Sequence, residues 1–129
     1  MTRRTFMSVA AGFSVVAGLA ALLAPAQSAA VFGLDVNEVG LSQTRMLGAA
    51  YLGYASVVWF GRNVLDNTAQ RAIALGNFVS WALSVVVTAA GVMGGLAGTQ
   101  SWLLVVVQVV FTAAWGYFAF SDRAVVAPT

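Results

Sequence analysis

The sequence predicts an all-α fold, a transmembrane four-helix bundle with antiparallel, up-down helices. The first observation is composition: 60% of the 129 residues are hydrophobic and 8% are charged, whereas about a quarter of a soluble domain is charged. The second is a set of four apolar segments, each close to the ~20 residues that a helix needs to cross a bilayer. We therefore expect one transmembrane domain, 1–129, with spans at about 5–24, 41–61, 72–96 and 102–120.

The first apolar segment fits two interpretations, a retained helix or a signal peptide, 1–30, cleaved after Ala30. The opening sequence Thr-Arg-Arg-Thr-Phe-Met, residues 2–7, resembles a twin-arginine export motif, which favours the signal peptide. The apolar run of about 19 residues is longer than the usual apolar region of a signal peptide, about 7–15 residues, and more spans follow it. We therefore predict a retained first helix that ends at Pro25.

Small residues recur every four positions along three of the predicted helices. This spacing places them on one helix face, where two backbones can approach closely. We expect the first and third spans to make the tightest contacts of the bundle. The predicted packing residues are Ala10, Ser14 and Gly18 in the first span, Ala49 and Gly53 in the second, and Gly91 and Gly95 in the third.

The second span contains a charge, Arg45, about four residues from its start. Exposing a guanidinium to hydrocarbon is costly, so we expect Arg45 to have a partner. The candidates are the carboxylates of Asp35 and Glu38 in the preceding loop and the amide of Gln108, which lies at a similar depth in the fourth span. The alternative is that Arg45 extends to the lipid headgroups as an interfacial anchor.

Polar residues form stripes on the third and fourth spans. Ser80 and Ser84 share one face of the third span, with Asn77 adjoining it, and Gln108 and Thr112 share a face of the fourth. Such stripes are common helix-packing surfaces, because the hydroxyls bond back to backbone carbonyls. We favour packing, and the alternative is the lining of a solute path with Arg45 at its mouth.

The arginines predict the orientation of the bundle. With four spans, five arginines share one side of the membrane and Arg45 stands alone on the other, so the positive-inside rule places both termini in the cytoplasm. We expect the tail, 124–129, to be disordered. The five arginines are Arg3, Arg4, Arg62, Arg71 and Arg123.

The composition also excludes several classes of function. Cysteine, histidine and lysine are absent, which removes thiolate nucleophiles, imidazole ligands of metals or haem, and Schiff-base chemistry. The scattered arginines form no basic face for nucleic acid. We therefore expect no enzymatic activity, no cofactor and no metal. The lack of lysine beside abundant Ala, Val and Gly is typical of a high-GC bacterium, so we place the protein in the inner (plasma) membrane of a bacterium.

The order of these features resembles that of small four-helix bacterial membrane proteins of unknown function, similar to the DoxX-like group. The residues that carry the resemblance are the loop Val31-Phe32-Gly33-Leu34, the sequence Arg45-Met46-Leu47-Gly48-Ala49-Ala50 at the second span, and Gly76-Asn77 in the third. The resemblance implies an inner-membrane bundle and no catalytic residue, since the cysteines of some DoxX-like proteins have no counterpart here.

Two functions remain after these exclusions. The first is a non-enzymatic membrane protein that contacts lipid and acts through its helix faces, as a homo-oligomer or as an accessory subunit of a larger complex. The second is a small channel or carrier for an anion or a neutral solute, lined by the polar residues of the third and fourth spans.

Overall fold

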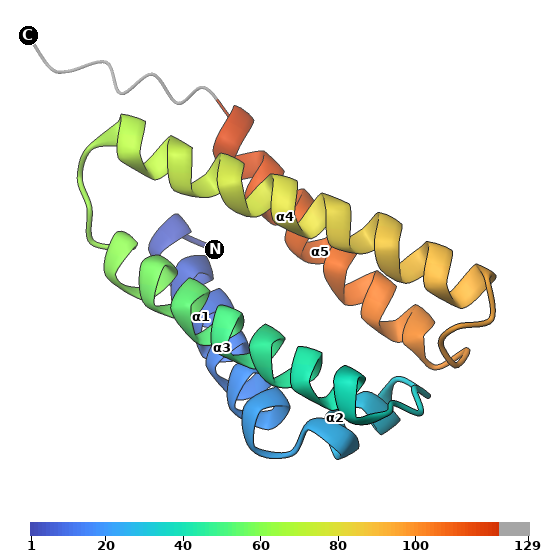
Figure 1. The fold of residues 1–129 in the computed structure, drawn as a ribbon. Helices are drawn as coiled ribbons and strands as arrows, with labels where there is room; N and C mark the ends of the chain where they lie inside the picture. The colour runs from blue at the N-terminus through green and yellow to red at the C-terminus, as the bar shows by residue number, and fades with distance from the viewer. Residues whose placement is uncertain (122–129) are drawn as a thin grey trace, which may run out of the picture.

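The all-α prediction is confirmed by a computed structural model, which describes residues 1–121. Within these residues the chain forms five helices (Figure 1). They are α1 (Arg3–Leu23), α2 (Pro25–Val31), α3 (Glu38–Gly61), α4 (Asn67–Met93) and α5 (Ser101–Phe120). Arg123 and the tail 124–129, on which we stated expectations above, lie outside the described residues.

Side-chain caps define where three of the long helices begin. The Thr2 hydroxyl accepts a hydrogen bond from the Thr5 amide at 3.2 Å, and Asn37 Oδ1 accepts one from Gly40 at 3.0 Å. Asp66 Oδ1 accepts one from the amide of Ala69 at 2.6 Å, at the start of α4. Each cap satisfies one of the amides that have no partner within the first turn of a helix. The caps therefore fix α1, α3 and α4 along the sequence.

Two helix boundaries differ from the sequence-based prediction. Pro25 ends α1 as expected but also begins the short helix α2, because proline is well suited to the first position of a helix, where no amide partner is needed. The third predicted span, 72–96, lies at 67–93 in the structure, since Asp66 caps it and Gly95 follows its end in a left-handed conformation with φ of 72°. Gly95 therefore belongs to a turn and does not pack as part of a helix.

The four long helices form two antiparallel pairs, α1 with α3 and α4 with α5 (Figure 1). Contact between α3 and α4 is much sparser than contact within either pair. We call these two pairs the N-terminal and the C-terminal hairpin. The space between the two hairpins is therefore filled by side chains, with little close approach of backbones.

Aromatic rings fill one half of the space between the hairpins. The ring of Phe6 on α1 lies 4.8 Å from that of Trp115 on α5, edge to face, and Trp81 on α4 stacks on Phe111 at 4.6 Å. Phe13 on α1 lies 5.3 Å from Phe111. Such pairs add to the stability from buried area by roughly 0.5–1.5 kcal/mol each. This aromatic cluster is the main apolar contact that joins the two hairpins.

The loops at the other end of the molecule provide a second contact between the hairpins. The carbonyl oxygen of Phe32, at the end of α2, accepts hydrogen bonds from the Gly98 amide at 3.1 Å and from the Ser101 hydroxyl at 2.8 Å. Ser101 is buried, so loss of this bond would leave a polar group without water. The hairpins are therefore joined by the aromatic cluster and, where the end of α2 meets the start of α5, by these hydrogen bonds.

Three helices are long and apolar enough to cross a membrane: α1, α4 and α5. They match three of the four predicted spans. The remaining predicted span, the second, at 41–61, lies within α3. This helix is 24 residues long, but among the described residues it is not one of the helices that are apolar enough to cross a membrane. The charge of Arg45 and its polar neighbours Gln43 and Thr44 lower the hydropathy of its first half.

Candidate functional site

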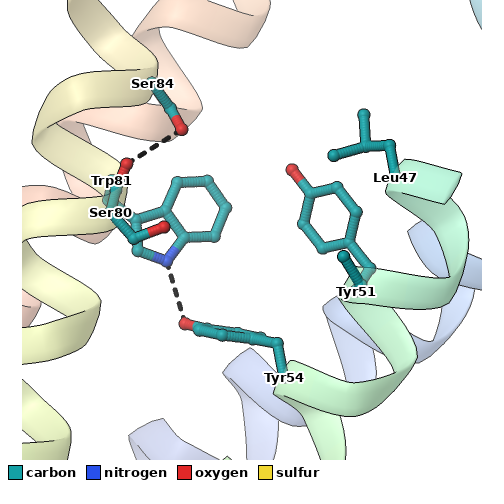
Figure 2. Close-up of a pocket in the computed structure, with 7 residues that line it drawn as sticks. Leu47, Tyr51, Tyr54, Ser80, Trp81 and Ser84 are labelled. Atoms are coloured by element: carbon teal, nitrogen blue, oxygen red, sulfur yellow. Dashed lines mark hydrogen bonds between the residues drawn. The ribbon is translucent and has the colours of Figure 1, made fainter. Parts of the chain in front are cut away.

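The candidate site lies in the seam between α3 and α4. A cavity of about 140 Å³ separates the two helices there, and seven residues line it (Figure 2). Leu47, Ala50, Tyr51 and Tyr54 come from successive turns of α3 and share one face because of their spacing. Ser80, Trp81 and Ser84 come from α4. We call this space the seam cavity.

One hydrogen bond closes the seam cavity at one end. The indole Nε1 of Trp81 donates to the hydroxyl oxygen of Tyr54 at 2.9 Å (Figure 2). Nearer the start of α4, Gln70 holds the two helices together. Its amide nitrogen donates to the backbone oxygens of Gly61 and Val64. Gln70 is 2% exposed, so these bonds are shielded from competing groups. The bonds fix α3 relative to α4 on this side of the cavity.

On the other side the helices are apart. Contact between α3 and α4 is sparse along their length. The cavity therefore opens to the outside of the bundle, and three of its lining residues, Leu47, Ala50 and Ser80, are exposed.

The polar groups of the cavity are neutral hydroxyls. Tyr54 accepts from Trp81 but keeps its own O–H to donate. The Tyr51 hydroxyl points toward α4 in Figure 2 and has no hydrogen-bond partner among the described residues. Ser84 donates to the backbone oxygen of Ser80 at 2.9 Å, while the Ser80 hydroxyl has no partner in the same part of the chain. The site therefore offers donors for a hydrogen-bond acceptor and presents no charge.

The predicted partnership of Arg45 is wrong. Arg45 is exposed, and no hydrogen bond or ion pair joins it to another described residue. It lies nine residues before Tyr54, about two and a half turns, which places it on the side of α3 opposite the cavity. Asp35 and Glu38 are also exposed, and the amide of Gln108 is bonded elsewhere. The arrangement agrees with the alternative that Arg45 is an interfacial anchor.

The predicted polar stripes divide between two environments. Asn77 and Gln108 are buried, with their amide nitrogens bonded to the Ile73 carbonyl at 2.6 Å and to the Thr88 hydroxyl at 3.0 Å. Thr112 donates to the Gln108 carbonyl at 2.8 Å. Only Ser80 and Ser84 face the seam cavity. Five residues proposed as one lining therefore do not share a path, because Asn77, Gln108 and Thr112 form bonds inside the C-terminal hairpin.

The small residues of α1 are buried against α3. Ala10, Ser14 and Gly18 are buried, and a Cβ at Gly18 would lie 2.9 Å from the carbonyl oxygen of Gly48 on α3. The tightest approach of backbones therefore joins the first and second predicted spans. The expectation that the third span supplies such a contact through Gly91 and Gly95 is wrong, since a Cβ at either position would meet no atom within 4 Å. The physical reason is the short connection through α2, which places α3 beside α1.

The other predicted packing residues have no neighbouring helix within the described chain. Ala49 and Gly53 are exposed on the outer face of α3. Side chains at Gly53, Gly91 and Gly95 would meet no atom within 4 Å. Gly48, which the spacing pattern did not include, makes the contact instead.

Sequence reasoning also missed the structural role of Arg62. Its guanidinium lies 3.1 Å from the centre of the Trp59 ring, and Nη1 donates to the Ser8 hydroxyl at 3.2 Å. The cation over the aromatic face and the bond to α1 fix the end of α3 beside the start of α1. A tryptophan three residues before an arginine at a helix end is a usable signal, since one turn of helix brings the two side chains together.

The aromatic residues of the cavity were missed for another reason. Tyr51, Tyr54 and Trp81 lie near the middle of their helices, whereas tryptophan and tyrosine of membrane proteins gather at the two interfaces. Trp81 stands at the centre of α4, 14 residues after Asn67 in a helix of 27. Its position within an apolar span indicates a partner inside the bundle, and Tyr54 provides it.

The described residues contain no cluster of three or more His, Cys, Asp or Glu side chains that could hold a metal ion. The lining of the seam cavity consists of hydroxyls, aromatic rings and aliphatic side chains. No protein-family model, no curated protein and no solved structure matches the chain. The helices themselves define its class, a multi-pass membrane protein with three apolar candidate spans.

Proposed function

We propose that the chain is a non-enzymatic protein of the bacterial inner membrane that acts through helix contacts, as an oligomer or as an accessory subunit. The observation that carries this proposal is the uncovered face of α4. This helix has 27 residues, and only 17% of its most apolar stretch is buried by the rest of the chain. Leu83 and Val87, 60% and 71% exposed, lie on this face with Gly76 and Ser80. A partner helix would approach this face closely at Gly76, where an added Cβ would meet no atom within 4 Å.

Membrane crossing by α3 is part of this proposal. Its 24 residues are long enough to cross ~30 Å of hydrocarbon at ~1.5 Å per residue. Arg45 lies near one end, where a long side chain reaches the headgroups. With α3 crossing, the chain has four spans and both termini on one side.

The cytoplasmic side is assigned from the arginines. The bond from Arg62 to Ser8 places the end of α3 beside the start of α1, so Arg3, Arg4 and Arg62 lie at the same end of the bundle. Arg71, in the first turns of α4, lies at this end as well. The positive-inside rule makes this end cytoplasmic. A retained first span is supported by the aromatic cluster, since Phe6 of α1 is a central member of it.

Cysteine labelling tests the orientation, because the chain contains no natural cysteine. Asn63→Cys, between α3 and α4, should be protected from a membrane-impermeant maleimide in intact cells. Val36→Cys, between α2 and α3, should be labelled. Equal labelling of both positions would show that α3 does not cross the membrane. A purified protein beginning at Val31 would instead establish the signal peptide.

Disulfide cross-linking in native membranes tests the helix contact. Gly76→Cys should form cross-linked species, a homodimer if the chain is an oligomer or a larger adduct if it serves another complex. Leu103→Cys is the matched control, because Leu103 is 72% exposed on α5, away from the proposed face. Adducts at Gly76 that do not exceed those at Leu103 would overturn the proposal.

The channel alternative has less support. A path needs polar groups that face a common space, and the amide nitrogens of Asn77 and Gln108 are bonded within the C-terminal hairpin. Flux of small anions or neutral solutes into proteoliposomes above the rate of empty liposomes would restore this alternative.

A further inference from the structure

We propose that the seam cavity binds a neutral, lipophilic molecule that carries a hydrogen-bond acceptor such as a carbonyl oxygen. This inference goes beyond helix association and depends only on membrane crossing by the helices that form the cavity.

The first argument is the chemistry of the lining. The Tyr51 hydroxyl has no partner among the described residues and points into the space between the helices (Figure 2). Tyr54, oriented by its bond from Trp81, retains a proton to donate. In hydrocarbon a donor without an acceptor is unfavourable, because no water is present to bond with it. Two such donors, from consecutive turns of α3, therefore select a ligand with an acceptor.

The second argument is charge. The seven lining residues include no Asp, Glu, Lys or Arg, and Arg45 lies on the opposite side of α3. A charged ligand would therefore enter the apolar membrane interior without a counter-ion, which is costly. The remaining lining, from Leu47, Ala50 and the Trp81 ring, favours an apolar body. The ligand is thus neutral and apolar apart from its acceptor.

The third argument is size. The cavity has a volume of about 140 Å³. Apolar cavities of roughly this volume accommodate one six-membered ring. The Trp81 and Tyr54 rings provide flat surfaces on which such a ring can stack. The rest of a larger ligand would extend through the exposed opening between α3 and α4 into the lipid.

The fourth argument is depth. Tyr51 lies ~2 Å and Tyr54 ~7 Å along the axis from the midpoint of α3, and Ser80 is at the midpoint of α4. The hydrocarbon core extends ~15 Å on either side of the bilayer centre, so the ester groups of phospholipids lie well away from this depth. The acceptor therefore belongs to a molecule that dissolves within the hydrocarbon, and not to a bilayer lipid.

A photoreactive ketone tests the proposal in proteoliposomes. The probe is benzophenone with a long alkyl tail, whose carbonyl is both the acceptor and the reactive group. Cross-linking should map to peptides of α3 and α4 that line the cavity. An unlabelled alkyl aryl ketone should compete, whereas its analogue with a methylene in place of the carbonyl should compete about 2–10-fold less well, the effect of one neutral hydrogen bond.

Two variants separate recognition from folding. Tyr51→Phe keeps the ring and removes the donor, so it should weaken the ketone by the same factor and leave the methylene analogue unchanged. Ala50→Leu fills the cavity from an exposed position, so it should reduce cross-linking by the benzophenone probe and weaken competition by both the ketone and its methylene analogue. Tyr117→Phe, on α5 outside the cavity, is the matched control and should change neither.

Three results would overturn the proposal. The first is equal competition by ketone and methylene analogue, which would show that the donors are not used. The second is cross-linking spread evenly over exposed surfaces, with no effect of Ala50→Leu. The third is probe affinity that rises when ester lipids are replaced by ether lipids, since the site would then be occupied by a lipid ester carbonyl. Failure of these tests leaves the Gly76 cross-linking result unaffected, so the two proposals are separable.

Discussion

Gly48→Ala is the most informative perturbation of the hairpin formed by α1 and α3. A Cβ at Gly48 would lie 2.7 Å from the Gly18 carbonyl oxygen and 2.7 Å from the Leu22 amide nitrogen. Both are backbone atoms of α1, so no side chain can rotate to relieve the clash. The two helices must separate, and their contacts along the whole hairpin weaken.

The magnitude follows from two opposing terms. Overpacking of a tight interface costs about 1–3 kcal/mol. Replacing glycine by alanine inside a helix returns up to about 1 kcal/mol. With the full return, we expect a net loss of about 0–2 kcal/mol in the free energy of unfolding.

Gly53→Ala is the matched control, because it lies on the same helix and its Cβ would meet no atom within 4 Å. The helix-propensity term is common to both variants, so their difference isolates the packing term, about 1–3 kcal/mol. Equilibrium unfolding of the purified protein in mixed micelles, followed by circular dichroism, measures both. Equal stability of the two variants would refute the close approach of α1 and α3.

Three further predictions concern the polar contacts. Tyr54→Phe should lower stability by about 1–3 kcal/mol because it leaves the Trp81 Nε1–H buried without an acceptor; if a Trp81→Phe background shows the same loss, the bond does not contribute. Ser101→Ala should remove a bond of about 1 kcal/mol to the Phe32 carbonyl and accelerate protease cleavage between α2 and α3, and an unchanged cleavage rate would argue against docking of this loop. Arg45→Ala should change stability by less than about 0.5 kcal/mol, since the side chain is exposed and unbonded; a larger loss in detergent would reveal a partner.

The sequence was sufficient for the class and for most helix positions. Apolar runs fix where α1, α4 and α5 lie, because the length that crosses a bilayer and the lack of charge leave little freedom. Pairing of helices was harder to predict. Gly18 was recognised by its spacing, but its partner Gly48 was not, although Gly40, Thr44 and Gly48 also recur every four residues. Spacing does not say which helix such a face meets, and the path of the chain through α2 brings Gly48 beside Gly18.

The cavity could not be predicted from spacing alone. A stripe such as Ser80 and Ser84 has the same periodicity whether it faces a neighbouring helix, lipid or a cavity. These two serines face a cavity because α3 and α4 are separated at this point, which the sequence does not reveal. For Arg45 the error was to expect a contact that the structure does not contain. The cost of burying its guanidinium suggested a protein partner, but a long side chain near a helix end can extend to the membrane interface instead.

The division into two hairpins has a consequence for how the protein is made. Each hairpin joins helices that are close along the chain, so, with α3 crossing the membrane as proposed, α1 can pair with α3 before α4 has been synthesised. The aromatic cluster, which joins Phe6 to Trp115, forms only when both hairpins are present. The hairpin is then the unit of insertion, and docking of two preformed units is the final step of assembly. A chain interrupted between Arg62 and Asp66 would deliver the same two units as separate polypeptides, and the aromatic cluster would become the interface that reunites them.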